Sequence, residues 1–230
     1  MTDDELKRVL EERIAAVEAR VTAACQRAER SRDSATIVAI TKTVSVRVAA
    51  LLPGLGIPNL GENRPQELWK KAAAVPGATW HFTGHLQRNK IEQTLPLIDL
   101  IHTVDSERLA LAIHEYALKR GLPVPVLLEV NCSRESNKGG FAPSELPGVT
   151  EKLHSLRGIA IRGLMTMAAY ADDPETARPA FSELRQLRDQ LGFPMPHLSM
   201  GMSGDFEVAI EEGATFIRLG TVLFEGLGGE

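Results

Sequence analysis

The sequence predicts an α/β fold: a single (β/α)8 TIM barrel with an extra helix at its N-terminus. Three observations lead to this fold class. Eight short apolar runs alternate with helix-like stretches along the 230 residues, and the alternation is evenly spaced from end to end. No Gly-x-Gly-x-x-Gly sequence follows the first run, as it would in a dinucleotide-binding sheet. A doubly wound open sheet also satisfies the alternation, but the even spacing and the missing fingerprint favour the closed barrel.

The N-terminal helix is predicted over roughly the first thirty residues. Thr2 and Glu5 have the spacing of a capping box, in which each side chain accepts a hydrogen bond from the other residue's backbone N–H. Charged residues fill one face of the predicted helix. The other face carries apolar residues at helical spacing: Leu6, Val9, Leu10, Ile14, Val17 and Val21.

Each strand is predicted from a short apolar run that ends in polar residues or glycine. The eight runs are 36–41, 59–61, 79–83, 100–104, 124–130, 159–165, 197–200 and 216–219. Three of the helices between them have clear ends. One covers 63–74 with Pro65 in its first turn, one covers 106–120 before Gly121, and one covers 174–191 before Gly192.

Composition and charge indicate one ordinary globular domain over residues 1–230. Apolar residues make up 43% of the chain and charged residues 24%. A net charge of −4 without a long basic run argues against a nucleic-acid surface. Cys25 and Cys132 give neither a disulfide framework nor a metal spacing, which favours a reducing compartment. The charged N-terminus is unlike a signal peptide and no apolar run is long enough to span a membrane, so we expect a cytoplasmic protein. We also expect a monomer.

Polar residues and glycines gather just after the predicted strands, where a TIM barrel has its active site. Lys42 follows the first strand, behind the apolar run 37–40. Apolar walls at the barrel mouth would disfavour its ammonium form, and the neutral amine is a nucleophile toward aldehydes. A lysine that extends into solvent is the ordinary alternative, and position alone does not exclude it.

The last two strands predict a phosphate site. Ser203 and Gly204 precede a predicted helix, so a serine N-cap and the N–H groups of a helix start could bind an anion there. Gly220 and Thr221, after the last strand, offer further N–H groups and a hydroxyl. An ordinary N-cap and an ordinary turn explain each pair alone, but together, after strands seven and eight, they favour phosphate. Arg218 beside them could form a surface salt bridge or donate to a ring nitrogen.

No metal site is predicted. His81 and His85 lack a third nearby ligand, so we expect structural histidines, and His102 belongs to the fourth strand. The sequence contains no Gly-x-Ser-x-Gly and no Ser/His/Asp arrangement that would indicate a hydrolase.

Eight segments occur in order between Ile37 and Gly226: VAITKTVS, GENRPQE, WHFTGHLQRNK, HTVD, NCSRESNKGGF, RGLMTM, LSMGMSGDFEVAIEEGAT and IRLGTVLFEG. In these segments the chain resembles the pyridoxal phosphate homeostasis proteins, the YggS/PROSC family. The barrel of that family is similar to the N-terminal domain of alanine racemase. One such segment would be weak evidence, whereas eight in order are specific.

The resemblance implies a pyridoxal 5′-phosphate (PLP) site with a Schiff base on Lys42. It places the phosphate on Ser203, Gly204, Gly220 and Thr221, Arg218 opposite the pyridine nitrogen, and Asn63 and Met165 along the ring pocket. It also makes PLP-dependent apoenzymes candidate partners. Lys138 matches a second lysine of some bacterial members.

Two positions depart from the family pattern. Val44 stands where some members carry another lysine, so a hand-over of cofactor through that position is not supported. The proline of the family's GPLQ-type stretch is replaced by His85.

The resemblance implies a carrier or regulator of PLP rather than an enzyme, with no catalytic residues. Related racemases oppose the Schiff-base lysine with a tyrosine from a separate C-terminal domain. Here the chain ends soon after its eighth strand, and Tyr116 and Tyr170 lie in no matching segment. An arginine at the pyridine nitrogen makes the cofactor a weaker electron sink. The alternatives are a fold-type III racemase or decarboxylase acting on amino acids, and a cofactor-free aldolase-type barrel.

Overall fold

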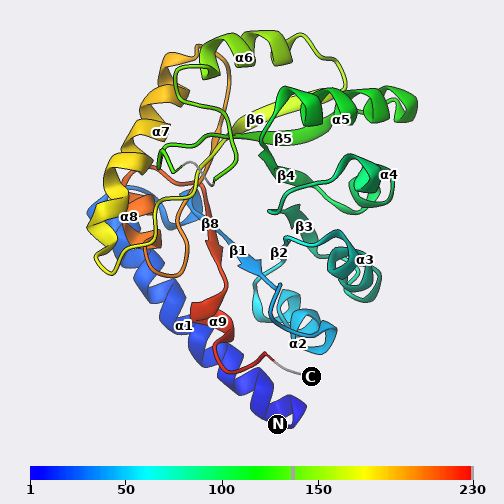
Figure 1. Cartoon of the computed structure of the whole chain (residues 1–230). Coiled ribbons are helices and arrows are strands. Elements are labelled where there is room, and N and C mark those ends of the chain that lie inside the picture. Colours follow the sequence, from blue (N-terminus) through cyan, green and yellow to red (C-terminus); the bar gives the residue numbers. More distant parts are fainter. Residues whose placement is uncertain (136–137, 229–230) are drawn as a thin grey trace.

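The structure is a computed structural model and describes residues 1–135 and 138–228. In these residues, parallel strands close into a barrel in chain order, and β8 pairs with β1 (Figure 1). The strands are β1 Thr36–Ile40, β2 Asn59–Glu62, β3 Thr79–Phe82, β4 Leu100–Val104, β5 Val124–Glu129, β6 Ile159–Met165, β7 His197–Ser199 and β8 Phe216–Leu219. The predicted fold class is confirmed. Two residues of the NCSRESNKGGF segment, Ser136 and Asn137, lie outside the described residues.

Helices alternate with the strands and surround the barrel (Figure 1). They are α1 Asp3–Arg27, α2 Val46–Leu51, α3 Pro65–Ala74, α4 Ile91–Thr94, α5 Glu107–Arg120, α6 Leu146–His154, α7 Arg178–Gln190, α8 Phe206–Glu211 and α9 Thr221–Phe224. The predicted helix 174–191 is divided, because a 3₁₀ turn over Pro174–Ala177 precedes α7. Asp173 caps that turn, and Pro179 has no N–H with which to continue it into the α-helix.

The N-terminal helix α1 begins at the predicted capping box. The Glu5 N–H donates to Thr2 Oγ1 at 3.2 Å, and the Thr2 N–H donates to Glu5 Oε2 at 2.8 Å. Its predicted apolar face is buried except for Val9, which is half-buried, and the helix lies along α8 and α9 (Figure 1). Arg13 adds a hydrogen bond to the carbonyl of Leu223 in α9 at 3.0 Å. Helix α1 therefore supports the two short helices that follow the last two strands.

Alternation along the strands separates two buried regions. In β1, Ile37 and Ala39 pack into the layer between the barrel and the helices, whereas Val38 faces the barrel interior. The interior cluster contains Val38, Leu100, Leu127, Met165 and Phe216. Buried polar side chains share that interior, among them Ser199, His102 and Arg218. In the part of the chain that the structure describes, no helix is long and apolar enough to cross a bilayer.

Candidate functional site

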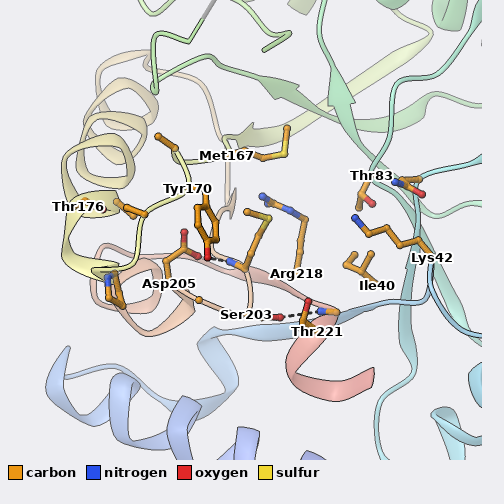
Figure 2. A pocket seen from close by; sticks show the side chains of 18 of the residues that line it. Ile40, Lys42, Thr83, Met167, Tyr170, Thr176, Ser203, Asp205, Arg218 and Thr221 are labelled. Atoms are coloured by element: carbon orange, nitrogen blue, oxygen red, sulfur yellow. Dashed lines mark hydrogen bonds between the residues drawn. The ribbon is translucent and has the colours of Figure 1, made fainter. Parts of the chain in front are cut away.

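A pocket of about 390 Å³ opens at the C-terminal ends of the strands (Figure 2). That volume is in the range of small-molecule sites. Of the eight predicted site residues, seven line it: Lys42, Asn63, Ser203, Gly204, Arg218, Gly220 and Thr221. Met165 is buried in the interior cluster below, and Met167, which packs against that cluster, lines the pocket instead.

Lys42 lies two residues beyond the end of β1. Figure 2 shows its side chain extending toward Thr83, on the side of the pocket near Ile40. The residue is exposed, so the desolvation expected from the apolar run before it is not present. β1 ends at Ile40, and Lys42 lies in the turn that follows, where it lines the open pocket. Its backbone carbonyl accepts a hydrogen bond from Arg64 Nη2 at 3.1 Å.

A buried ion pair lies behind the ends of β1 and β2. Lys71 Nζ donates to Glu62 Oε1 at 2.5 Å and to the backbone carbonyl of Thr41 at 2.6 Å. Thr41 Oγ1 donates to the same carboxylate oxygen at 2.7 Å. Lys71 and Glu62 are 1% and 0% exposed. The pair thus fixes the residue before Lys42 and the residue before Asn63 relative to each other.

Asn63 presents an unpaired polar atom to this region. Its backbone N–H donates to Glu62 Oε2 at 3.3 Å. Its side-chain Oδ1 is buried and has no hydrogen-bond partner within residues 1–135 and 138–228. Buried polar atoms are rarely left without a partner, so Asn63 fits a ligand that donates or bridges a hydrogen bond there.

Ser203 joins the loops after β7 and β8. Its hydroxyl oxygen accepts from the backbone N–H of Gly220 at 3.3 Å (Figure 2) and from that of Val222 in α9 at 3.2 Å. The predicted serine N-cap is wrong, because Asp205 occupies the N-cap position of α8. A turn from Met202 to Asp205, closed by backbone and side-chain hydrogen bonds, separates Ser203 from the helix.

This loop pair retains the donors that an anion needs. The backbone N–H groups of Gly204 and Thr221 donate to no acceptor in the described chain. A side chain at position 220 would approach the carbonyl of Ile40, whereas position 204 has open space. Two N–H groups and two hydroxyls therefore face one end of the pocket, a donor set that suits a phosphate.

Arg218 is held rigidly at the floor of the pocket. Nη1 donates to Ser199 Oγ at 2.6 Å, and Nη2 donates to the carbonyl of Thr166 at 3.0 Å. The side chain is 5% exposed, which excludes the surface salt bridge. Burial lowers the pKa of Arg218 to about 10, with Asp205 and Glu129 opposing the shift, so the guanidinium is charged at neutral pH. Its remaining N–H groups can donate to a ligand in the pocket.

Glu129 is a buried carboxyl that the sequence did not single out. It ends β5 and is 7% exposed. Burial raises its pKa to about 7, and Asp105 adds to the shift while Arg218 opposes it. Glu129 therefore lies close enough to Arg218 for the two charges to interact.

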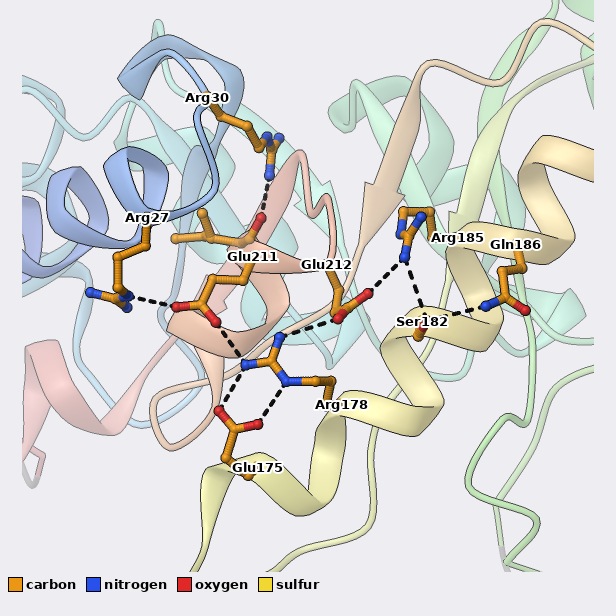
Figure 3. A network of polar contacts seen from close by, with 10 residues as sticks. Arg27, Arg30, Glu175, Arg178, Ser182, Arg185, Gln186, Glu211 and Glu212 are labelled. Atoms are coloured by element: carbon orange, nitrogen blue, oxygen red, sulfur yellow. Dashed lines mark hydrogen bonds and ion pairs between the residues drawn. The ribbon is translucent and has the colours of Figure 1, made fainter.

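The loop after β6 forms a second wall that sequence reasoning missed. Tyr170 lines the pocket although it is 93% exposed (Figure 2). Such a loop carries no periodic signal that would predict its position. Its far end is anchored by Arg178, which donates to Glu175, Glu211 and Glu212 (Figure 3). The anchor ties the start of α7 to α8.

The remaining candidates lie outside the pocket. His81 and His102 are buried in the barrel, as expected of structural histidines, and His85 pairs with Asp105 at 2.8 Å on the surface. Lys138 Nζ donates to the carbonyl of Ala168 at 2.9 Å and does not line the pocket. Within the described residues, no three His, Cys, Asp or Glu side chains could hold a metal ion.

The model of the alanine racemase N-terminal domain matches residues 13–227. The chain belongs to this family of barrels. Among its relatives, the pyridoxal phosphate homeostasis protein of Aquifex aeolicus is 43% identical over 219 residues, covering 93% of this chain and 96% of the relative. The mouse protein of the same name is 36% identical, covering 86% of this chain and 80% of its own. Within the wider family, the chain therefore belongs to the pyridoxal phosphate homeostasis proteins.

Solved structures agree with this assignment. The structure of a protein from Bifidobacterium adolescentis, described as unknown, is 38% identical with a TM-score of 0.90, covering 97% of this chain and 98% of its own. The structure of PipY from Synechococcus elongatus with PLP bound is 30% identical with a TM-score of 0.81, covering 94% of this chain and 99% of its own. An alanine racemase from Clostridium difficile, at 17% identity and a TM-score of 0.77, shares the fold over 58% of its chain.

Proposed function

We propose that this protein binds PLP at Lys42 and serves intracellular PLP homeostasis as a carrier or regulator, without substantial catalysis. One observation carries the proposal. A single pocket brings together a primary amine, a buried guanidinium and a pair of loops rich in N–H and hydroxyl donors. A phosphorylated pyridine aldehyde needs these three groups. PipY, described with PLP bound, is a relative over nearly the whole chain.

Each residue of the pocket has a role in this proposal. Lys42 Nζ is the amine that would bond to the aldehyde carbon. Ser203, Gly204, Gly220 and Thr221 would hold the phosphate, Arg218 would donate to the pyridine nitrogen, and the unpaired Asn63 Oδ1 would contact a polar substituent of the ring. Met165 would support the ring from below through Met167.

Bound PLP supplies an electron-withdrawing ring next to its carbonyl carbon. Arg218 limits that property, because a guanidinium that stays charged donates a hydrogen bond but does not transfer its proton to the ring nitrogen. The ring nitrogen then remains unprotonated and is a weaker electron sink. This favours holding the cofactor over activating a substrate on it.

The competing function is a fold-type III racemase or decarboxylase, and the position of Tyr170 favours it. Tyr170 lines the pocket and could face the lysine as a second base. Against this, the side chain is 93% exposed and its hydroxyl has no hydrogen-bond partner among residues 1–135 and 138–228 that would activate it. We therefore assign Tyr170 no catalytic role.

The 230 residues would form one PLP-binding domain that acts as a monomer in the cytoplasm. The recipients or donors of the cofactor would be PLP-dependent apoenzymes.

A titration tests the binding function. Purified protein is titrated with PLP while visible absorbance is followed, and Lys42→Ala is compared with Lys138→Ala. We expect the wild type and Lys138→Ala to develop the same band and Lys42→Ala to develop none. A full band in Lys42→Ala would contradict the assignment.

The choice between carrier and enzyme needs a separate experiment. Amino acids are incubated with PLP-loaded protein in deuterated water, and deuterium at the α-carbon is measured. We expect no wash-in above that of free PLP, because a missing general base alone typically costs about 10²–10⁴-fold in rate. Rapid wash-in that Lys42→Ala abolishes would establish an enzyme.

A further inference from the structure

A continuous chain of buried polar side chains runs through the barrel interior. Arg218 Nη1 contacts Ser199 Oγ at 2.6 Å, and Ser199 Oγ contacts His102 Nδ1 at 2.8 Å. His102 Nε2 then contacts His81 Nδ1 at 2.8 Å, and His81 Nε2 contacts Asn59 Oδ1 at 3.0 Å. Asn59 begins β2 at the far end of the barrel, so the chain links that end with the pocket floor.

The direction of the hydrogen bonds follows from the arginine. A guanidinium only donates, so Ser199 Oγ accepts from Arg218. Ser199 is 0% exposed, and His102 is its other hydroxyl contact within the described residues. The Ser199 hydroxyl hydrogen therefore has one available acceptor, His102 Nδ1.

The direction of these hydrogen bonds then determines the tautomer of each histidine. With Nδ1 accepting, His102 carries its proton on Nε2 and donates to His81 Nδ1. His81 in turn carries its proton on Nε2 and donates to Asn59 Oδ1. The opposite direction would leave the hydroxyl hydrogen of a fully buried serine without an acceptor, which proteins avoid.

The surroundings keep both rings neutral. Burial lowers the pKa of His81 to about 4 and that of His102 well below its ordinary value. His197 lowers both pKa values further, and His81 and the Arg218 charge lower that of His102. Phe216 packs against both imidazoles, at 5.4 Å from His81 and 5.5 Å from His102 between ring centroids.

We propose that Ser199, His102, His81 and Asn59 form a hydrogen-bond relay of fixed direction that positions Arg218 as a donor toward the cofactor ring. Ser199 and the histidines are positioning residues and touch no ligand. The part concerning the ring rests on the proposed PLP function, whereas the direction of the relay does not.

The direction is measured on the ligand-free protein. Side-chain ¹⁵N NMR of labelled full-length protein gives the protonation of each ring nitrogen. The resonances are assigned with variants in which one histidine at a time is replaced. We expect His81 and His102 to be neutral with the proton on Nε2, unchanged from about pH 6 to pH 8. An Nδ1 proton on either ring, or a charged ring in that range, would overturn the relay.

The positioning role is measured with two ligands. Ser199→Ala removes the acceptor that orients Arg218, and we expect it to weaken PLP binding about tenfold. An analogue with C–H in place of the pyridine nitrogen should bind Ser199→Ala and wild type equally. If Ser199→Ala bound both ligands equally more weakly than wild type, Ser199 would have a general structural role and would not position Arg218.

A control variant separates a loss of the relay from a general loss of a buried hydroxyl. Thr150→Val removes another buried hydroxyl, one without a hydrogen-bond partner in the described chain, and should leave both affinities unchanged. Failure of wild-type protein to bind PLP at all would refute the proposed function and leave the NMR result as the test of the relay. If Ser199→Ala does not fold, the wild-type tautomers still decide the direction.

Discussion

The buried pair of Lys71 and Glu62 gives the sharpest prediction about stability. Lys71→Met would leave the Glu62 carboxylate in the interior with its cationic partner removed and would free the carbonyl of Thr41. Breaking a buried ion pair by removing one partner typically costs about 3–5 kcal/mol. A domain of this kind is stable by roughly 5–15 kcal/mol, so the loss would be a large fraction of the total.

The neighbouring lysine provides the matched control. Lys70 pairs with Glu67 at 3.1 Å, but its side chain is 67% exposed. Lys70→Met should therefore change the free energy of unfolding by no more than about 0.5 kcal/mol. The double variant Lys71→Met/Glu62→Gln replaces the stranded carboxylate with a neutral amide that can still accept from Thr41 Oγ1, and should recover part of the loss.

Urea denaturation of the four proteins measures these differences. We expect the midpoint to fall sharply in Lys71→Met, partly recover in the double variant and stay unchanged in Lys70→Met. A fall in Lys71→Met no larger than in Lys70→Met would refute the role assigned to the buried pair. Because the pair adjoins Lys42 and Asn63, a folded Lys71→Met protein should also bind PLP more weakly.

Three further predictions concern the pocket and the buried carboxyl near Arg218. Ser203→Ala should lower affinity for PLP by roughly 1.5–3 kcal/mol and change affinity for unphosphorylated pyridoxal little, as calorimetry with both ligands would show; equal losses would exclude a phosphate contact. Glu129→Gln should gain stability over wild type as pH rises. The folded-state pKa of Glu129 is raised to about 7, so the free energy of unfolding of the wild type falls by about 2–3 kcal/mol between pH 4.5 and pH 8. A difference in unfolding free energy between the two proteins that does not change with pH would contradict this. Tyr170→Phe should leave PLP affinity unchanged and α-deuterium exchange at the level of free PLP; exchange above that level in wild type that Tyr170→Phe abolishes would reveal a catalytic tyrosine.

Much of the fold follows from local sequence patterns. The strands are found where short apolar runs occur, because a parallel barrel buries both faces of each strand. Helix ends marked by capping residues were also predictable, such as the capping box of Thr2 and the left-handed Gly121 after α5. Seven of the eight predicted site residues line one pocket, since the carboxyl ends of barrel strands meet at one face.

The differences arise where a residue's role depends on distant partners. Ser203 does not cap α8, because its hydroxyl accepts from Gly220 and from Val222 in the first turn of α9, which the local sequence does not reveal. Tyr170 reaches the pocket through a loop whose path is set by the anchor at Arg178. Glu62 and Lys71, nine positions apart in sequence, become an ion pair because a turn and a helix bring them together under Lys42.

Covalent trapping tests the central claim most directly. Protein saturated with PLP is reduced with borohydride, digested and mapped by mass spectrometry. We expect one reduced pyridoxyl adduct, on Lys42, with Lys138 unmodified at stoichiometric PLP. An adduct confined to any other lysine, or no adduct on protein that binds PLP, would contradict the assignment of Lys42 as the residue that holds the cofactor.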